Sequence, residues 1–238
     1  MDLAHRINTS ELMDSADLSS AELHSTLRFI SMTNRYLGGN HVFFRYLQAW
    51  SRDWPKGQKI TFLDVGTGDA DIPISIVQWG RARGFDLRVT AIDSTPKIAE
   101  IARQNARSYP EIEVVEADFF SYAPGSETSD YVLCSLFLHH VPDDRLIQAL
   151  KLCDHLARRG VIIHDLLRSP TCFYGIKALT ALFGNRIVRN DGPLSVRRAF
   201  LPEELEFLAR RADIPYLFPR RHSSFRLSLA GQKNTQYA

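Results

Sequence analysis

The chain has 238 residues, of which 45% are hydrophobic, and this suits one globular α/β domain with an added segment. Its formal net charge of +2 gives no general reason to expect a nucleic-acid partner. Cys134, Cys153 and Cys172 show neither a C-x-x-C pair nor zinc-ligand spacing, so we expect reduced cysteines in a cytoplasmic protein and no metal site. The N-terminus has no apolar signal-peptide core, and no apolar run reaches the length of a transmembrane segment.

The region before the first predicted strand, residues 10–54, has a helical pattern. Candidate N-caps at residues 17–20 precede apolar residues at helical spacing, and a second helix is predicted over residues 41–54. Two interpretations stay open, because these helices could cover one side of a sheet or form a lid over a ligand site. For the domain organisation we expect an N-terminal helical lid, residues 1–56, followed by a main domain, residues 57–238.

Residues 60–74 carry the clearest signal. Residues 60–65 predict a buried strand, which ends in the tight turn Gly66-Thr67-Gly68. A helix follows, with Asp71 expected as its N-cap and Pro73 in its first turn. Such a corner binds nucleotides, because glycines let the backbone approach a ligand and the helix N-terminus offers N–H groups. A dinucleotide fingerprint would need a third glycine in place of Asp71, which disfavours NAD-dependent redox chemistry.

Strands and helices alternate after this corner. Further strands are predicted over residues 87–93, 112–118, 129–140 and 160–165. Helices are predicted between them, over residues 72–83, 96–107 and 143–156. This alternation predicts an α/β fold with a parallel sheet and helices on both of its faces.

The turn D-x-G-x-G-x-A, residues 64–70, resembles motif I of the class I S-adenosylmethionine (SAM) methyltransferases, with Ala70 in place of the last glycine. The resemblance implies a seven-stranded, doubly wound, mostly parallel Rossmann-like sheet, with SAM across the carboxyl ends of the strands. It implies that Asp93 accepts hydrogen bonds from the ribose hydroxyls and that Asp118 meets the adenine amino group, with Phe119 packed on the ring. The cofactor-binding residues expected on this basis are Asp64, Gly66, Thr67, Gly68, Asp93, Ser94, Asp118, Phe119 and Ser135.

Two other stretches resemble the same superfamily. N-x-x-L-x-G, residues 34–39, looks like the N-terminal segment of the quinone C-methyltransferases of ubiquinone and menaquinone synthesis. Phe200-Leu201-Pro202-Glu203-Glu204-Leu205 resembles the family's F-x-P-E-E-L helix start. Strands over residues 216–218 and 225–229, joined by a hairpin turn at residues 220–224, would complete the sheet with an antiparallel final strand.

Residues 166–199 interrupt the alternation and are strongly basic. Residues 172–183 are predicted to be helical, and Asn190-Asp191-Gly192-Pro193 is predicted to form a turn. The basic residues of this insertion are Arg168, Lys177, Arg186, Arg189, Arg197 and Arg198. Asp191 is its single acid, which gives a local charge of +5 (six cations less one anion). We expect the insertion to shape the acceptor pocket and to attract an acidic or phosphate-bearing acceptor or carrier protein, unless it is a solvated surface.

The stretch after the fourth strand carries the candidate general base. Leu138-His139-His140-Val141-Pro142-Asp143-Asp144 resembles L-H-D-W-x-D-E of small-molecule O-methyltransferases, in which the first histidine is the base. This resemblance assigns the catalytic role to His139, with His140 and His164 as lesser candidates. Asp143, Asp144 or Asp165 could orient the base, and the alternative is a histidine that packs beneath the cofactor.

The expected function is SAM-dependent methyl transfer to a small molecule. The acceptor is expected to be an aromatic, quinone-like or polyketide-derived hydroxyl or ring carbon. No N/D-P-P-Y/F motif follows the fourth strand, and no nucleic-acid partner is expected. The alternatives are a protein or RNA methyltransferase, or a protein that binds SAM without catalysis.

Overall fold

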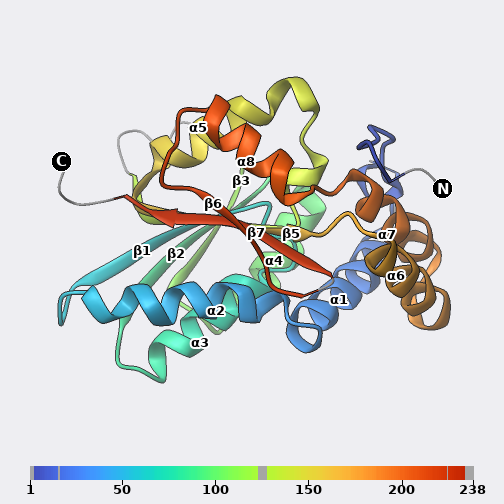
Figure 1. Ribbon diagram of the computed structural model, residues 1–238. Coiled ribbons are helices and arrows are strands. Elements are labelled where there is room, and N and C mark those ends of the chain that lie inside the picture. Colours follow the sequence, from blue (N-terminus) through green and yellow to red (C-terminus); the bar gives the residue numbers. More distant parts are fainter. Residues whose placement is uncertain (1–2, 16, 123–127, 224, 234–238) are drawn as a thin grey trace.

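The computed structural model describes residues 3–15, 17–122, 128–223 and 225–233, and they form a sheet with helices on both faces (Figure 1). The strands are β1 Lys59–Val65, β2 Asp86–Asp93, β3 Ile112–Glu116, β4 Ser129–Ser135, β5 Ala157–Leu166, β6 Phe218–Arg221 and β7 Arg226–Gln232. Their order in the seven-stranded sheet is β3-β2-β1-β4-β5-β7-β6, and β7 runs antiparallel to both of its neighbours. The predicted doubly wound sheet with an antiparallel final strand is therefore confirmed.

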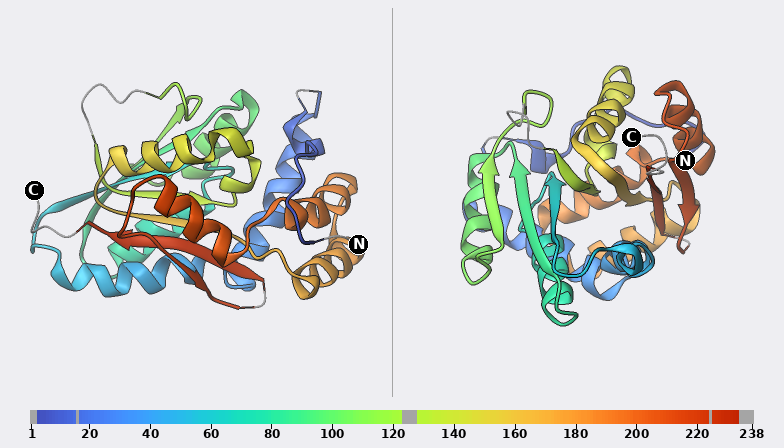
Figure 2. Two further views of the ribbon diagram at one scale, coloured as in Figure 1. Left: turned by 45° about the horizontal axis from the view of Figure 1, so that its top comes forward. Right: turned by 90° about the vertical axis from the view of Figure 1, so that its left-hand side faces the viewer.

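The helices form two layers over this sheet and a third group at its carboxyl edge (Figures 1 and 2). They are α1 Ser20–Tyr36, α2 Gly39–Trp50, α3 Asp71–Arg81, α4 Pro96–Ala106, α5 Leu146–Leu156, α6 Pro170–Phe183, α7 Arg186–Arg198 and α8 Pro202–Arg211. Phe43 and Leu47 of α2 share an apolar core with Ile76 of α3 and the sheet. Leu150 of α5 and Leu205 of α8 belong to the core on the other face.

The two predicted N-terminal helices have different neighbours. α2 packs against the sheet with its apolar face, as a cover would. α1 packs instead against α4 and α7, where Leu23 and Leu27 contact Ile98 and Ile187. The chain between residues 3 and 14 then lies beside α7 and contains a short 3₁₀ turn, Leu12–Asp14. The division into a lid and a main domain stays a prediction.

Buried side chains of the insertion hold this N-terminal segment, residues 3–14, in place. Arg168 donates to the carbonyl oxygens of Leu3 and Ala4 at 2.9 and 3.2 Å. The carboxylate of Asp191 accepts from the backbone N–H groups of Leu12 and Met13, both at 2.9 Å. The segment is thus fixed by partners more than 160 residues further along the chain.

The predicted turn at residues 190–193 is wrong, because these residues lie inside α7. Gly192 serves close helix packing rather than a turn: a Cβ atom there would lie 2.8 Å from Thr180 Cγ2 and 2.9 Å from Ile176 Cγ2 of α6. The chain turns earlier, after Gly184, where the Asn185 side chain caps α7 by accepting from the Val188 N–H.

Three further boundaries differ from the predictions. Ala70, not Asp71, is the N-cap of α3 and adopts a left-handed conformation with φ 63°. Asp71 is the first helical residue, and its carboxylate accepts from the Ile72 N–H and the Asn34 side chain. α2 begins at Gly39 rather than residue 41 and ends at Trp50, with a 3₁₀ turn after it.

The last two strands are also shifted along the chain. β6 spans Phe218–Arg221, not residues 216–218, and β7 begins at Arg226. Tyr216 lies before β6, where its hydroxyl donates to Asp154 at 2.6 Å. Residue 224 of the predicted hairpin turn lies outside the described residues.

Asp191→Ala should loosen the N-terminal segment without unfolding the sheet. The substitution removes a charged acceptor from the N–H groups of Leu12 and Met13, and charged hydrogen bonds contribute roughly 1.5–3 kcal/mol each. Hydrogen exchange at these two amides should accelerate at least about tenfold, while amides of β1 and β4 keep their protection. Glu206→Ala, which breaks an exposed ion pair on α8, is the matched control. Unchanged exchange at both amides would show that Asp191 does not hold the segment.

Candidate active site

Two cavities adjoin at the carboxyl ends of β1 and β4, where the order of the strands reverses. The first cavity has walls from α1, α6 and α7, and the second lies beside the residues that follow β2 and β3. The residues that line both are Met13, Gly66, Gly68, Leu136 and His140. Ligands of open doubly wound sheets bind at such a switch point.

The structure brings the predicted cofactor residues to these two cavities. Asp64, Gly66, Thr67, Gly68 and Ser135 line the first cavity. Gly66, Gly68, Asp93, Ser94, Asp118 and Phe119 line the second. These residues therefore lie close together, and the contact that each makes with a ligand stays a prediction.

Asp93 stands at the end of β2 beside the glycine turn. Its carboxylate accepts from the Gly68 N–H at 3.2 Å and from the Thr95 N–H at 3.0 Å. Burial raises its pKa above the ordinary value, although these two hydrogen bonds oppose the shift. Asp118, in contrast, is exposed, lines the second cavity and accepts from Ser121.

The glycine turn leaves no room for a side chain at Gly66. Gly66 has φ +67°, and a Cβ atom there would lie 2.6 Å from the ring of Phe137. A residue other than glycine would therefore be strained and would push this ring toward the cavity. Ala70 shows that alanine is accommodated in the left-handed conformation at the place where motif I usually has glycine.

The first cavity contains an acid and a base that lack full hydrogen bonding. One carboxylate oxygen of Asp64 and one terminal nitrogen of Arg226 have no hydrogen-bond partner among the described residues. Burial, followed by the charges of Asp71 and Asp93, raises the pKa of Asp64 to about 8. Arg226 is buried in β7, where another nitrogen donates to the Thr33 carbonyl at 3.4 Å. A carboxylate and a guanidinium at one cavity suit a ligand with an ammonium and a carboxylate group.

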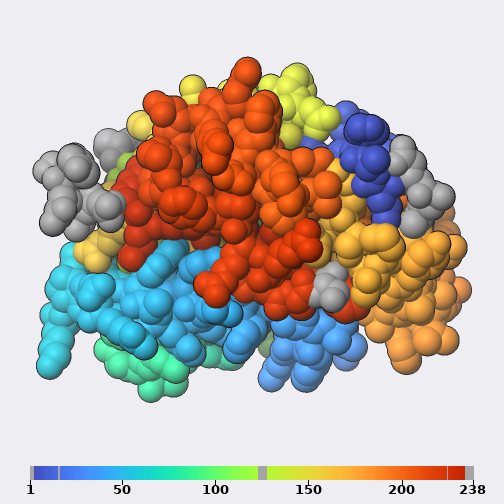
Figure 3. Space-filling model, in the orientation of Figure 1, coloured from blue at the N-terminus to red at the C-terminus, as the bar shows by residue number. Residues whose placement is uncertain are grey.

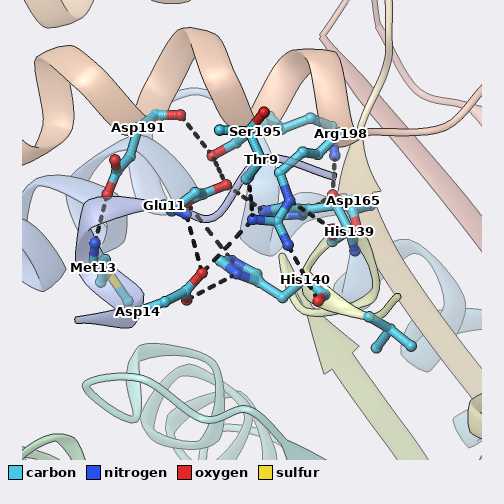
Figure 4. Close-up of polar contacts among 12 residues, drawn as sticks. Thr9, Glu11, Met13, Asp14, His139, His140, Asp165, Asp191, Ser195 and Arg198 are labelled. Atoms are coloured by element: carbon cyan, nitrogen blue, oxygen red, sulfur yellow. Dashed lines mark hydrogen bonds and ion pairs between the residues drawn. The ribbon is translucent and has the colours of Figure 1, made fainter. Parts of the chain in front are cut away.

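His139 is held by one of the three acids that the sequence left open. Asp165 of β5 accepts from His139 Nδ1 at 2.7 Å and from the His139 backbone N–H at 3.1 Å (Figure 4). Burial opposes the ionisation of Asp165, but the histidine and the hydrogen bonds keep its pKa below the ordinary value. An ionised Asp165 requires a proton on Nδ1, so in the neutral imidazole the lone pair lies on Nε2. This Nε2 atom is buried and has no hydrogen-bond partner among the described residues.

The N-terminal segment adds Glu11 to this site. Glu11 Oε1 lies 3.7 Å from His139 Nε2 and accepts from the Ser195 hydroxyl at 2.8 Å. Its other oxygen lies 3.9 Å from His140 Nε2, and His140 Nδ1 lies 3.3 Å from Asp14. Burial raises the pKa of Glu11 to about 7, although the charge of His140 opposes the shift. Ligand atoms of Glu11, His139 and His140 lie within 4.8 Å of one another, a spacing that would also allow a metal ion.

His164, the third catalytic candidate, lies away from this cluster. It lines neither cavity, its Nδ1 lies 3.2 Å from Ser135 Oγ, and its ring meets the edge of Phe43. Burial lowers its pKa well below the ordinary value. It is therefore a neutral core residue at neutral pH.

The basic insertion does not present all its charges at the cavity. Arg168 and Arg198 are buried and donate mainly to backbone carbonyl oxygens. The cavity wall from α6 and α7 instead combines apolar Ile176 and Val188 with polar Thr180, Asp191 and Ser195.

Sequence reasoning missed Glu11 and Arg226, whereas Asn34 and Arg198 were noted only as parts of longer stretches. Arg226 offered a signal, since it is the only charged residue of a largely buried strand. Glu11 offered no such signal, because nothing in the neighbouring sequence indicates that it would face His139.

Comparison with known proteins gives consistent results. A family model described as a methyltransferase domain matches residues 62–160. The demethylmenaquinone methyltransferase of Bacillus licheniformis is 27% identical over 187 residues, which cover 77% of this chain and 74% of the relative. Several other curated relatives carry the same name at 24–27% identity.

Solved structures share the fold. The plantazolicin methyltransferase in complex with SAH superposes with a TM-score of 0.68 at 12% identity, covering 92% of each chain. Human N-acetylserotonin methyltransferase in complex with SAM gives a TM-score of 0.64 at 17% identity, covering 91% of this chain and 57% of that chain. The family model, the curated relatives and the shared fold together support a class I SAM-dependent methyltransferase.

Proposed function

We propose that SAM lies across both cavities, with its nucleoside in the second and its amino-acid end in the first. Asp93 and Asp118 at the second cavity provide acceptors for ribose hydroxyls and for an adenine amino group. Asp64 and Arg226, each with an unpaired polar atom at the first cavity, provide partners for the ammonium and the carboxylate. Gly66 and Gly68 at the junction leave room for the sulfonium.

We propose that the acceptor is a small, largely apolar molecule with a hydroxyl group. The observation that carries this is His139 Nε2, an unpaired buried atom at the first cavity, with Asp165 behind the ring. The remainder of that cavity is mainly apolar, with walls that include Phe29, Ile30 and Ile176. An aromatic, quinone-like or polyketide-derived ring suits such walls.

SAM supplies an electrophilic methyl group on its sulfonium. His139 Nε2 accepts the proton of the acceptor hydroxyl, so that the oxygen gains the charge that a nucleophile needs. Asp165 fixes the ring through Nδ1–H and stabilises the positive charge that the ring acquires. Glu11, 3.7 Å from Nε2, also faces that charge.

Methylation of a ring carbon is the second candidate. It is favoured by the curated relatives, which are named demethylmenaquinone methyltransferases. The position of the transferred methyl in the NMR spectrum of the product distinguishes O-methyl from C-methyl.

Asp93→Ala should weaken SAM binding while the fold survives. The substitution removes a charged acceptor at the second cavity, and charged hydrogen bonds contribute roughly 1.5–3 kcal/mol each. The dissociation constant from calorimetric titration should therefore rise at least about tenfold. Asp86→Ala, at the exposed start of the same strand, is the control and should bind SAM normally. Equal affinity of the Asp93→Ala variant and the native protein would place the nucleoside elsewhere.

SAM binding should release a proton from Asp64 near neutral pH. With a pKa of about 8, this carboxyl is mostly protonated at pH 7, whereas an ammonium partner favours its ionised form. Affinity should therefore rise as the pH increases toward 8. Titration in buffers of different ionisation enthalpy measures the released protons, and Asp64→Asn should remove this contribution. The same proton release from the variant would exclude Asp64 as the source.

His139→Ala should lower kcat by roughly 10²–10⁴ and leave SAM affinity nearly intact, because a general base acts on the acceptor. Asp165→Asn should lower kcat in the same direction, since the ring loses its orienting carboxylate. Initial rates with phenols and hydroxyquinones measure the effect, and His155→Ala on the exposed face of α5 is the control. Loss of SAM binding in His139→Ala would assign this residue to the cofactor floor.

The same assay separates a base from a metal ligand. Activity should persist in EDTA if His139 acts as a base. Loss of activity in EDTA, with recovery on adding a divalent cation, would reassign Glu11, His139 and His140 to a metal site.

A further inference from the structure

Large exposed apolar side chains gather on α6. Tyr174, Leu182 and Phe183 are 61, 73 and 72% exposed. Along the helix, Tyr174, Lys177, Ala178, Ala181 and Leu182 follow the i, i+3, i+4, i+7, i+8 spacing of one helix face, and all five are exposed. We call this face, together with Phe183, the outer face of α6. A helix of a globular protein normally turns such a face toward a core.

The other side of α6 already packs against the protein. Cys172 and Phe173 are buried, and Ile176 and Thr180 line the first cavity. The outer face is therefore not the apolar side that holds the helix on the domain. α6 separates the acceptor cavity from an apolar surface.

Cations flank the outer face along the chain. Lys177 lies within it, and Arg186 and Arg189 follow at the exposed start of α7. Residues 170–190 contain no Asp or Glu. Arg186 contacts Glu22 only at 3.7 Å, across an exposed pair. These side chains belong to the gold-to-orange segment on the right-hand side of the molecule (Figure 3).

We propose that the outer face of α6, with Arg186 and Arg189, docks on an anionic lipid surface. Helices that lie in a membrane interface typically combine apolar side chains with flanking lysine and arginine residues. Among the described residues, no helix is long and apolar enough to cross a bilayer, so contact through this helix would be peripheral. The charge pattern favours an anionic headgroup layer over a second copy of this chain, because two such basic faces would repel each other.

Docking would also place the acceptor cavity next to the lipid. Ile176 and Thr180 line that cavity from the same helix that carries Tyr174 and Leu182 outward. A lipophilic acceptor would reach the cavity past α6 without crossing water. This last step rests on the proposed function, whereas docking itself does not.

Co-sedimentation of the full chain with phosphatidylcholine vesicles, with and without phosphatidylglycerol, tests the docking. We expect binding to the anionic vesicles and weaker binding as salt increases. The double variant Leu182→Glu/Phe183→Glu should bind at least about tenfold more weakly. Phe207→Glu, a substitution of another exposed phenylalanine (60%) on α8, should bind like the native protein.

Circular dichroism and SAM titration on each variant establish that the fold and the cofactor site persist, so a failure of docking is separate from a failure of the proposed function. Absence of binding to anionic vesicles, or equal binding by the double variant, would overturn the proposal. Sedimentation velocity without lipid tests whether a second copy of this chain binds the outer face instead. Self-association that the double variant abolishes would assign the outer face to that second copy.

Discussion

One buried guanidinium connects the segments that make the site. Arg198, near the end of α7, donates to the carbonyl oxygens of Thr9, His139 and His140 at 3.0–3.2 Å. These acceptors belong to the N-terminal segment and to the turn after β4, which are far apart in the sequence. A guanidinium can serve several acceptors at once because it has five N–H donors in a fixed plane. Its charge is also opposite to the acids around it, of which Asp14 lies at 3.6 Å.

Without cationic partners such as Arg198, the buried carboxyl groups of this site would destabilise the folded protein. Burial raises the pKa values of Glu11, Asp64 and Asp93, so the folded protein holds these carboxyls against their preference for water. Arg226 is buried with its pKa lowered for the same reason. Groups of opposite charge that lack full pairing fit a zwitterionic ligand better than they stabilise the empty fold. Ligand binding would therefore add stability that the protein alone does not have.

Elements whose structure depends on residues close together in the sequence could be predicted from the sequence alone. The strand, the glycine turn and the helix at residues 59–81 follow from local residue types, and so do the acids at strand ends such as Asp93. Parallel strands then bring those ends together. The prediction failed at residues 190–193, because a Gly-Pro pair is typical of turns whereas packing of Gly192 against α6 keeps the helix intact. Glu11 could not be predicted, since its partner Ser195 lies 184 residues away.

That same separation has a consequence for how the protein is made. The partners of the N-terminal segment, Arg168, Asp191 and Arg198, leave the ribosome long after residues 3–14 do. Until then the central strands can pair, but the first cavity lacks the walls from α6 and α7. Domains emerge from the ribosome N-terminal end first, at roughly 5–20 residues per second. The nascent chain thus has its glycine turn early and its complete site late, so residues 3–14 reach their final places only after residues that are synthesised later.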